Sequence, residues 1–212
     1  IDLDKDIELW RKEEVDYIFI PQENYIYPKD FAELDEIKSG EKGSLFEGAH
    51  RPGHFDGVLT VVNRLFDLVN PTSVVFGKKD AQQLYLVKEF LANKSNNLKI
   101  IEAEIIRDEY GLAMSSRNRL LSKSGINIAR NIFQILLNTK EHFIQNQDIQ
   151  QSEDFGKKLF NENAIEFDYL NFVDPKYFET PDSNREKLLL ITAAYVEGIR
   201  LIDNMEVIQW RT

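Results

Sequence analysis

A short glycine- and lysine-containing turn is the first stretch of the sequence with the chemistry of a binding site. It reads Phe76-Gly-Lys-Lys-Asp-Ala-Gln-Gln83 and lies where a β-rich run gives way to a helical pattern. Gly77 would let a ligand approach the backbone, while the helix N-terminus and the Lys79 ammonium favour an anion such as phosphate. Lys79, Asp80 and Gln83 can share one helix face. A capping Asp80 and a solvated lysine would explain the same residues without a ligand.

A second polar stretch, the serine-arginine loop Gly111-Leu-Ala-Met-Ser-Ser-Arg-Asn-Arg119, has the donors to grip a polyanion. Ser115 and Ser116 supply hydroxyls, and the guanidinium of Arg117 can form paired hydrogen bonds with a phosphate. Ser-Ser-Arg is also a common sequence, and a polar loop before a helix capped by Ser122 accounts for it as well. Spacing alone leaves both interpretations open.

The histidines and the acidic N-terminal run give weaker signals. His54 precedes an apolar helical pattern, so the positive end of that helix should lower its pKa and favour the neutral imidazole. His50 and His54 have a spacing seen in metal sites, but Pro52 and Gly53 between them argue against a helical pair. The acidic run that contains Asp6 is typical of a solvated helix face.

Composition and missing motifs exclude several classes of protein. Lys+Arg is 26 and Asp+Glu is 36, so the formal net charge is −10 and sequence-independent nucleic-acid binding is not expected. Cysteine is absent, which removes disulfides, thiolate metal sites and cysteine nucleophiles. The longest nearly apolar run, Leu188 to Val196, is far shorter than the ~20 residues of a membrane span. We therefore expect a cytoplasmic protein without a membrane partner. Walker, G-x-G-x-x-G and G-x-S-x-G patterns are missing as well.

The elements that must position these residues alternate in the first half of the chain. Apolar periodicity and turn residues predict helices at 3–10, 58–69 and 81–96, strands at 15–20, 73–76 and 98–106, and a short edge strand at 34–37. Strands that alternate with helices favour a parallel sheet with right-handed crossovers. The glycine-lysine turn, residues 76–83, would then lie at the end of a parallel strand, where open α/β sheets bind ligands.

The pattern changes after residue 106. Helices are expected at 122–143 and 155–160, followed by strands at 165–173 and 188–196. Runs of helix followed by runs of strand indicate an α+β unit. The sequence therefore predicts an α/β protein with a Rossmann-like parallel-sheet nucleotide-binding domain over residues 1–106 and a smaller α+β lid domain over residues 107–212.

Three blocks taken together resemble one enzyme family. Arg51-Pro-Gly-His-Phe-Asp-Gly-Val-Leu-Thr-Val-Val62, the glycine-lysine turn and the serine-arginine loop match the pantoate–β-alanine ligases in order and spacing, and the similarity covers essentially the whole chain. That family belongs to the nucleotidyltransferase superfamily, which is related to class I aminoacyl-tRNA synthetases. The resemblance implies ATP-dependent condensation of pantoate with β-alanine through a pantoyl-adenylate, with release of AMP and pyrophosphate. It also implies Mg²⁺ as cofactor and a homodimer.

Position by position, the resemblance implies three groups of site residues. The ATP-binding group is Gly77, Lys78, Lys79, Asp80, Ile106, Met114, Ser115, Ser116 and Arg117. Within it, Asp80 would accept from the ribose, the Ile106 backbone would contact adenine, and the side chains of Lys79, Ser115, Ser116 and Arg117 would offset charge on the triphosphate. The pantoate group is Gln83, Arg51 and His54. Asp6 matches a position associated with magnesium.

The sequence departs from the family in two places. Lys78 stands where the family usually has glutamate, and Ala81 where it usually has an aromatic residue. The family's N-terminal Met-Gly-x-Leu-His-x-Gly-His motif is not found in these 212 residues. We therefore expect the first domain to be incomplete at its N-terminus and the native polypeptide to carry roughly 40 to 60 more residues before Ile1, enough for one βαβ step. A catalytically inactive nucleotide-binding fragment and another nucleotidyltransferase of the same superfamily remain alternatives.

Overall fold

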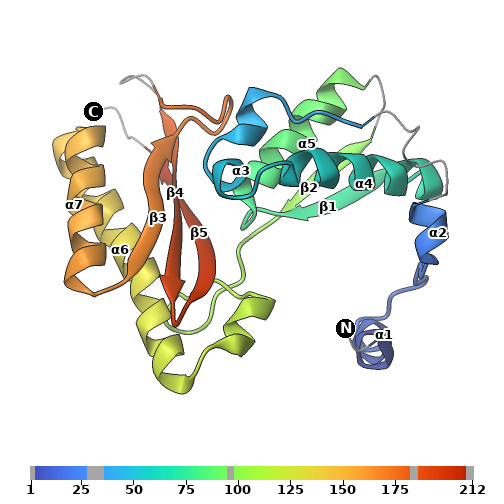
Figure 1. The fold of residues 1–212 in the computed structure, drawn as a ribbon, viewed down its shortest axis with the longest axis horizontal. Helices are drawn as coiled ribbons and strands as arrows, with labels where there is room; N and C mark the ends of the chain where they lie inside the picture. Colours follow the sequence, from blue (N-terminus) through green and yellow to red (C-terminus); the bar gives the residue numbers. More distant parts are fainter. Residues whose placement is uncertain (1–2, 28–35, 95–97, 182–185, 209–212) are drawn as a thin grey trace.

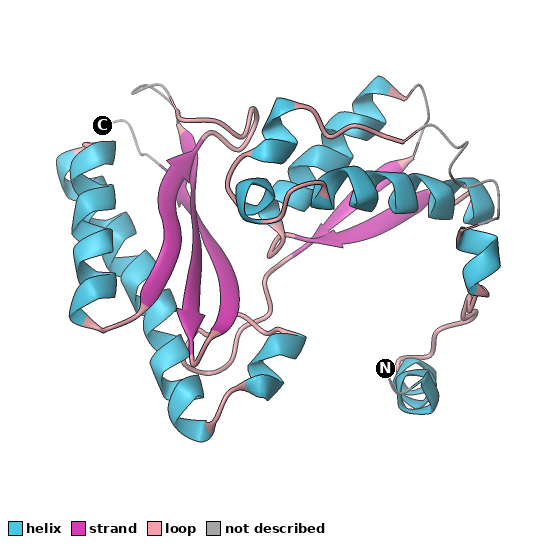
Figure 2. Ribbon diagram, in the orientation of Figure 1, coloured by secondary structure: helices cyan, strands magenta, loops and turns pink. Residues whose placement is uncertain are grey.

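The computed structural model describes residues 3–27, 36–94, 98–181 and 186–208, which form two sheets with separate sets of helices (Figures 1 and 2). The N-terminal half contains α1 (Leu3–Lys12), α2 (Glu23–Ile26), η2 (Glu41–Ser44), α3 (Glu47–His50), α4 (His54–Val69), β1 (Ser73–Gly77), α5 (Ala81–Asn93) and β2 (Lys99–Ala103). The C-terminal half contains η3 (Ser116–Leu120), α6 (Lys123–Asn146), α7 (Ile149–Glu162), β3 (Glu166–Val173), β4 (Lys187–Val196) and β5 (Ile199–Ile208).

The N-terminal half is built on a parallel strand pair. β1 and β2 run in register from Ser73 opposite Lys99 to Gly77 opposite Ala103, and α5 forms the crossover between them. The helices α4 and α5 pack together because their apolar faces meet over the sheet. Their shared core consists of Phe55, Leu59, Leu86, Val87 and Leu91. This packing fixes the start of α5, and therefore the turn before it.

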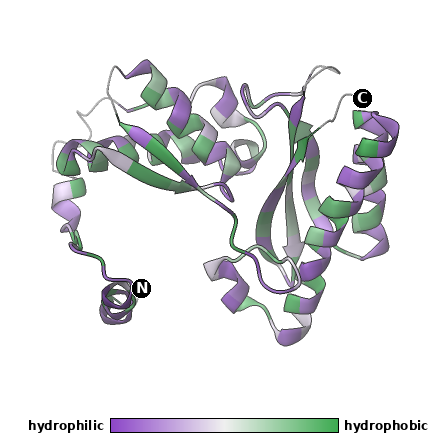
Figure 3. Ribbon diagram, turned by 180° about the vertical axis from the view of Figure 1, so that it is seen from behind, coloured by the Kyte–Doolittle hydropathy of each residue, from purple (hydrophilic) through white to green (hydrophobic). Residues whose placement is uncertain are grey.

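The C-terminal half is an antiparallel sheet in the order β3-β4-β5, with α6 and α7 packed against it. Both helices carry green apolar and purple polar bands, as expected for helices with one buried face (Figure 3). Ser122 caps α6, because its hydroxyl accepts from the backbone N–H of Gly125 at 3.0 Å. The predicted cap is thus confirmed.

A two-residue turn joins β4 to β5. Glu197 and Gly198 both have positive φ, 52° and 73°, the backbone that a tight hairpin requires. The Glu197 carboxylate also accepts from the backbone N–H of Ser122 at 2.8 Å and from its hydroxyl at 2.5 Å. The hairpin turn therefore anchors the beginning of α6.

The predicted strand at Val15–Ile20 is wrong. This segment is irregular and its side chains lie in solvent, with Tyr17 92% and Phe19 53% exposed. A strand requires a hydrogen-bonded neighbour, and within the described residues β1 and β2 pair only with each other.

Other elements also differ from the prediction: α4 begins at His54, α5 ends at Asn93, and α7 spans Ile149–Glu162. β2 ends at Ala103 because the chain leaves the sheet there to cross to the C-terminal half. β5 was not predicted, because polar residues such as Asp203, Asn204 and Glu206 interrupt its apolar pattern. Of the expected edge strand at 34–37, residues 34–35 lie outside the described part of the chain, and residues 36–37 are not in a strand.

The first helix lies apart from both sheets. α1 has no buried residue, and Figure 1 shows it at the end of an extended segment. Among the described helices, none combines the length and the apolarity needed to cross a membrane.

Apolar and ionic contacts join the two halves. Phe178 stacks on Tyr85 of α5 at 5.3 Å between ring centroids and meets Phe46 edge-on at 5.7 Å. Beside them, Arg200 of β5 binds the Glu47 carboxylate of α3 through both terminal nitrogens, at 2.7 Å each. Burial opposes a charge on Glu47, but the hydrogen bonds from Arg200 and from the Tyr169 hydroxyl outweigh it and lower its pKa. The buried ion pair therefore persists at neutral pH.

Replacing Glu47 by alanine should destabilise the protein by about 3 kcal/mol, because it removes a carboxylate partner from a buried guanidinium. Chemical denaturation at pH 7 measures this loss. Glu162→Ala is the matched control, since Glu162 pairs with Lys158 in an exposed i,i+4 contact at 3.7 Å and should cost no more than about 0.5 kcal/mol. Equal losses for the two variants would contradict the assignment.

Candidate active site

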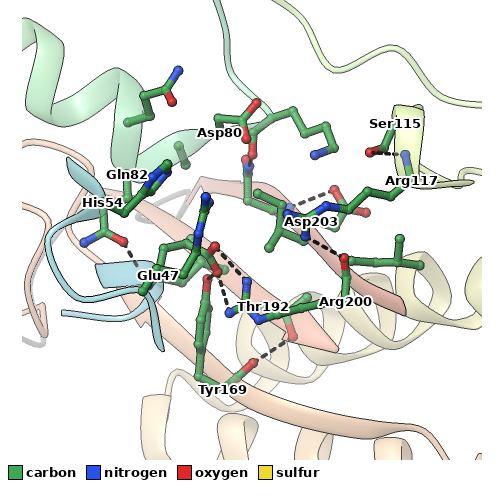
Figure 4. Close-up of a pocket in the computed structure, with 18 of the residues that line it drawn as sticks. Glu47, His54, Asp80, Gln82, Ser115, Arg117, Tyr169, Thr192, Arg200 and Asp203 are labelled. Atoms are coloured by element: carbon green, nitrogen blue, oxygen red, sulfur yellow. Dashed lines mark hydrogen bonds and ion pairs between the residues drawn. The ribbon is translucent and has the colours of Figure 1, made fainter. Parts of the chain in front are cut away.

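A cavity of about 380 Å³ lies between the two halves, and both chemistry-bearing stretches of the sequence line it (Figure 4). The glycine-lysine turn and the start of α5 form one side, and the serine-arginine loop and β5 form another. The predicted site residues that line it are Arg51, His54, Lys79, Asp80, Gln83, Met114, Ser115, Ser116 and Arg117. The topology thus brings together segments that are more than 30 residues apart in the chain.

The glycine-lysine turn presents a cation and a carboxylate to the cavity. Lys79, Asp80 and Gln83 all line it, as their spacing along the start of α5 predicts. Asp80 occupies the N-cap position of α5 but makes no side-chain cap hydrogen bond. Capping therefore does not account for this carboxylate. A Cβ added to Gly77 would meet no atom within 4 Å, so the backbone there is open to a ligand.

The serine-arginine loop is held by a short hairpin. Ile106 accepts from the backbone N–H of Met114 at 2.8 Å, and Arg107 bridges to Ala113. Gly111 forms the bend with a φ of +94°, and a Cβ there would lie 2.1 Å from the Phe133 ring. Both the backbone conformation and the close approach therefore require glycine.

At the tip of this loop, the polar groups are already partly ordered. The Ser115 hydroxyl accepts from the backbone N–H of Arg117 at 3.2 Å, which caps the short helix η3. The Arg117 guanidinium donates to the backbone carbonyl of Arg200 at 2.9 Å, and Figure 4 shows its side chain extended along the cavity wall. Four of its five N–H donors are not used by this bond. Arg117 can therefore bind a phosphate from a fixed position.

Arg51 and His54 approach the cavity from the start of α4. His54 is the first residue of that helix and is half-buried. Burial and the neighbouring charge of Arg51 lower its pKa below the usual 6.5. The direction agrees with the expectation from the sequence, although burial and the Arg51 charge, and not the helix end, are its causes. His54 can accordingly donate or accept a hydrogen bond without adding charge.

Four predicted residues do not line this cavity. Gly77 and Lys78 belong to the turn, but Lys78 points to the other side of the junction, where it pairs with Glu104 and lies 3.4 Å from Glu206. Ile106 lies in the segment between the halves with its side chain 71% exposed. Asp6 lies on α1, which is not among the elements that line the cavity and which Figure 1 shows apart from α5 and β5. Within the described residues, no group of three or more acidic or histidine side chains could hold a metal ion.

Sequence reasoning missed part of the cavity wall. The missed polar and charged residues are Glu47, Gln82, Tyr169, Thr192, Arg200, Asp203 and Asn204. Gln82 is almost fully buried and bonds to backbone groups of Glu47, Lys42 and Leu45, so its neighbour Gln83 is the glutamine left to meet a ligand. The others come mainly from β3, β4 and β5, where each makes contacts with residues distant in sequence. A prediction of β5 would have pointed to Arg200, Asp203 and Asn204.

The charges of the cavity suit an anionic ligand. Arg51, Lys79 and Arg117 contribute cations, whereas the carboxylates of Glu47 and Asp203 are bound by arginines. Arg107 binds both oxygens of Asp203 at 2.7 and 2.8 Å. The glycine-lysine turn and the serine-arginine loop each contribute a cation to this cavity, which can therefore hold a polyphosphate.

Comparison with known sequences finds one family over nearly the whole chain. The family model described as pantoate-beta-alanine ligase matches residues 1–206. A pantothenate synthetase from Thermosipho melanesiensis is 35% identical over 205 residues, which cover 96% of this chain and 72% of that protein. Another from Caldicellulosiruptor bescii is 38% identical over 208 residues, covering 97% and 73% respectively.

Solved structures of the same family have the same fold as this chain. The crystal structure of pantothenate synthetase from Thermus thermophilus superposes with a TM-score of 0.91 at 34% identity, covering 98% of this chain and 75% of that one. The pantoate-beta-alanine ligase of Francisella tularensis, solved in complex with beta-gamma ATP and beta-alanine, has a TM-score of 0.74 at 31% identity, with 97% and 70% coverage. Sequence, fold and cavity thus give one answer: the chain belongs to the pantoate–β-alanine ligase family.

Proposed function

We propose that this chain catalyses the ATP-dependent condensation of pantoate with β-alanine to pantothenate, with release of AMP and pyrophosphate. The observation that carries the proposal is the single cavity that both the glycine-lysine turn and the serine-arginine loop line. These two segments, far apart in the sequence, both supply cations to that cavity, and a triphosphate requires such charges. Family membership supplies the identity of the acid and the amine.

In the proposed reaction, a carboxylate oxygen of pantoate attacks the α-phosphorus of ATP and pyrophosphate leaves. The amine of β-alanine then attacks the acyl carbon, loses a proton and displaces AMP. No protein side chain becomes covalently bound, so the protein contributes through positioning and through stabilisation of charge.

We assign the nucleotide to the junction of the two halves. Lys79, Ser115, Ser116 and Arg117 would offset the charge that develops on the triphosphate, and Asp80 would accept from the ribose hydroxyls. The backbone of Gly77, Lys78, Ile106 and Met114 would complete the nucleotide site. The proposed division at residue 106 then separates a unit that binds ATP and pantoate from a lid, and nucleotide binding would favour closure.

We assign pantoate to the side of the cavity formed by Gln83, Arg51 and His54. Gln83 offers a donor and an acceptor for hydroxyl and carboxylate groups. Arg51 would balance the carboxylate charge before attack. The neutral His54 would act as a hydrogen-bonding group and not as a second cation.

Magnesium would enter with the nucleotide. The described residues hold no cluster of three metal-binding side chains, and Mg²⁺ commonly keeps its water while bound to substrate phosphates. The cavity geometry gives no support to Asp6 as its ligand. We further propose a homodimer that works in the cytoplasm.

Pantoate-dependent exchange of pyrophosphate into ATP tests the proposal directly. An exchange that ignores pantoate would favour another nucleotidyltransferase, and ATP binding without exchange would indicate an inactive nucleotide-binding protein.

Arg117→Ala should lower the rate of this exchange by about 10²- to 10³-fold, the loss typical of one donor that stabilises developing charge. Arg119→Ala is the control, since Arg119 is an exposed arginine of the same loop that does not line the cavity. It should exchange at nearly the parent rate. The role of Arg117 would be rejected if both variants behaved alike.

Gln83→Ala should raise the KM for pantoate about tenfold while ATP affinity changes less than about threefold, because the amide is expected to contact only the acid. Steady-state kinetics and calorimetry separate the two effects. In contrast, Gln82→Ala breaks three buried hydrogen bonds and should lower the melting temperature. Loss of ATP affinity in Gln83→Ala with pantoate unaffected would overturn the assignment.

The His54 imidazole should titrate below the usual value of 6.5, because burial and the Arg51 charge disfavour its protonated form. Proton NMR of the three histidines gives the midpoint. In Arg51→Gln one of these two causes is removed, so the His54 midpoint should rise. A midpoint above 6.5, or one that Arg51→Gln leaves unchanged, would contradict this electrostatic picture.

A further inference from the structure

Asn204 of β5 holds the backbone of the glycine-lysine turn from the opposite half of the protein. Its carboxamide nitrogen donates to the carbonyl of Lys78 at 3.0 Å and to the carbonyl of Lys79 at 2.9 Å. An amide NH₂ has two hydrogens, so each carbonyl can receive its own. Asn204 is only 3% exposed, which means that water cannot readily replace these bonds.

The asparagine is itself fixed. Its backbone N–H donates to the Asp203 carboxylate at 2.7 Å, and its carbonyl accepts from Arg107 at 3.0 Å. Arg107 binds both oxygens of Asp203, donates to the Gly111 carbonyl at 2.8 Å and lies over the Phe133 ring. Asn204 therefore rests on the same hairpin that carries the serine-arginine loop.

These contacts form a continuous path from the glycine-lysine turn to the serine-arginine loop. On the N-terminal side, the turn has one further backbone tie, from Lys78 N–H to the Ala103 carbonyl at 2.9 Å. The carbonyl of Lys79 is the link to Asp80, so its direction decides where the Asp80 carboxylate and the Lys79 ammonium leave the backbone. The donor that sets this direction belongs to β5.

We infer that Asn204 is a positioning residue for the nucleotide: its carboxamide orients the Lys78 and Lys79 carbonyls so that Lys79 and Asp80 meet ATP in register with the serine-arginine loop. The inference rests on the proposed function, since it concerns the same ATP site. It assigns to β5 a role that depends on hydrogen-bond donation and not on the volume of the side chain.

Two substitutions separate donation from volume. Asn204→Ala removes both donors and should weaken ATP binding about tenfold, because the Lys79 and Asp80 side chains would no longer be held in register with the serine-arginine loop. Asn204→Asp keeps the shape but sets carboxylate oxygens against two carbonyl oxygens, so it should weaken ATP binding at least as much. Calorimetry with ATP alone measures both. Pantoate affinity should stay within about twofold of the parent, because Asn204 does not support Gln83, Arg51 or His54.

Asn204→Ser and Glu206→Gln complete the series. Serine retains one donor, so Asn204→Ser should give an ATP affinity between those of the parent and Asn204→Ala. If Asn204→Ala does not fold, Asn204→Ser still tests the inference. Glu206 contacts the Lys78 ammonium from the same strand at 3.4 Å but touches no turn carbonyl, so Glu206→Gln should bind ATP like the parent. Hydrogen exchange should quicken in residues 77–81 of Asn204→Ala while β4 stays protected.

ATP affinity at the parent level in Asn204→Asp would overturn the inference, as would an equal loss of ATP and pantoate affinity in Asn204→Ala. Both results leave the proposed function standing, because the parent protein still binds both substrates. A parent protein that binds neither ATP nor pantoate would instead overturn the proposed function and the inference together.

Discussion

A carboxylate from α3 and a guanidinium from β5 neutralise each other at the boundary of the two halves, and the shape of the cavity depends on this pair. Glu47 and the side chain of Arg200 are both largely buried, and Arg200 also pairs with Asp168 at 2.6 Å. Without Arg200 the Glu47 carboxylate would face a large desolvation cost, and without Glu47 the guanidinium would keep one carboxylate partner of two. Arg200 also offers its backbone carbonyl to Arg117. One residue thus joins the halves through its side chain and holds the Arg117 guanidinium through its backbone carbonyl.

The cavity concentrates positive potential in a protein whose net charge is −10. Of the acidic side chains that line it, Glu47 and Asp203 are bound by arginines, and Lys79, Arg51 and Arg117 also line the space where an anion would lie. A low-dielectric cleft strengthens such local charges relative to distant surface charges, which salt screens. The negative net charge therefore disfavours binding of a nucleic acid, but it does not disfavour binding of a nucleotide inside the cavity.

The parts of the fold that could be predicted are those that local pattern determines. The long helix α6 and its Ser122 cap, the β1-turn-α5 unit and the strands β3 and β4 follow from periodicity and capping. Val15–Ile20 has the composition of a strand but has no pairing partner among the described residues, and composition does not reveal partners. β5 escaped prediction because its polar residues face the junction, where Asp203 and Asn204 find partners that lie about 100 residues or more away. For the same reason the sequence did not reveal the residues of β5 that line the cavity. The glycine-lysine turn and the serine-arginine loop could be found, because their residue types are typical of anion-binding sites.

The two-residue hairpin between β4 and β5 has a consequence for the order of folding. Its ten residue pairs close short loops, so the strand that carries Arg200, Asp203 and Asn204 can form from contacts local in sequence. The parallel pair β1–β2 must wait for its helical crossover, and the bond between Glu47 and Arg200 closes a loop of 153 residues. We therefore expect the antiparallel sheet β3-β4-β5 to form while the glycine-lysine turn is still mobile. The active site would then be assembled in the last step of folding.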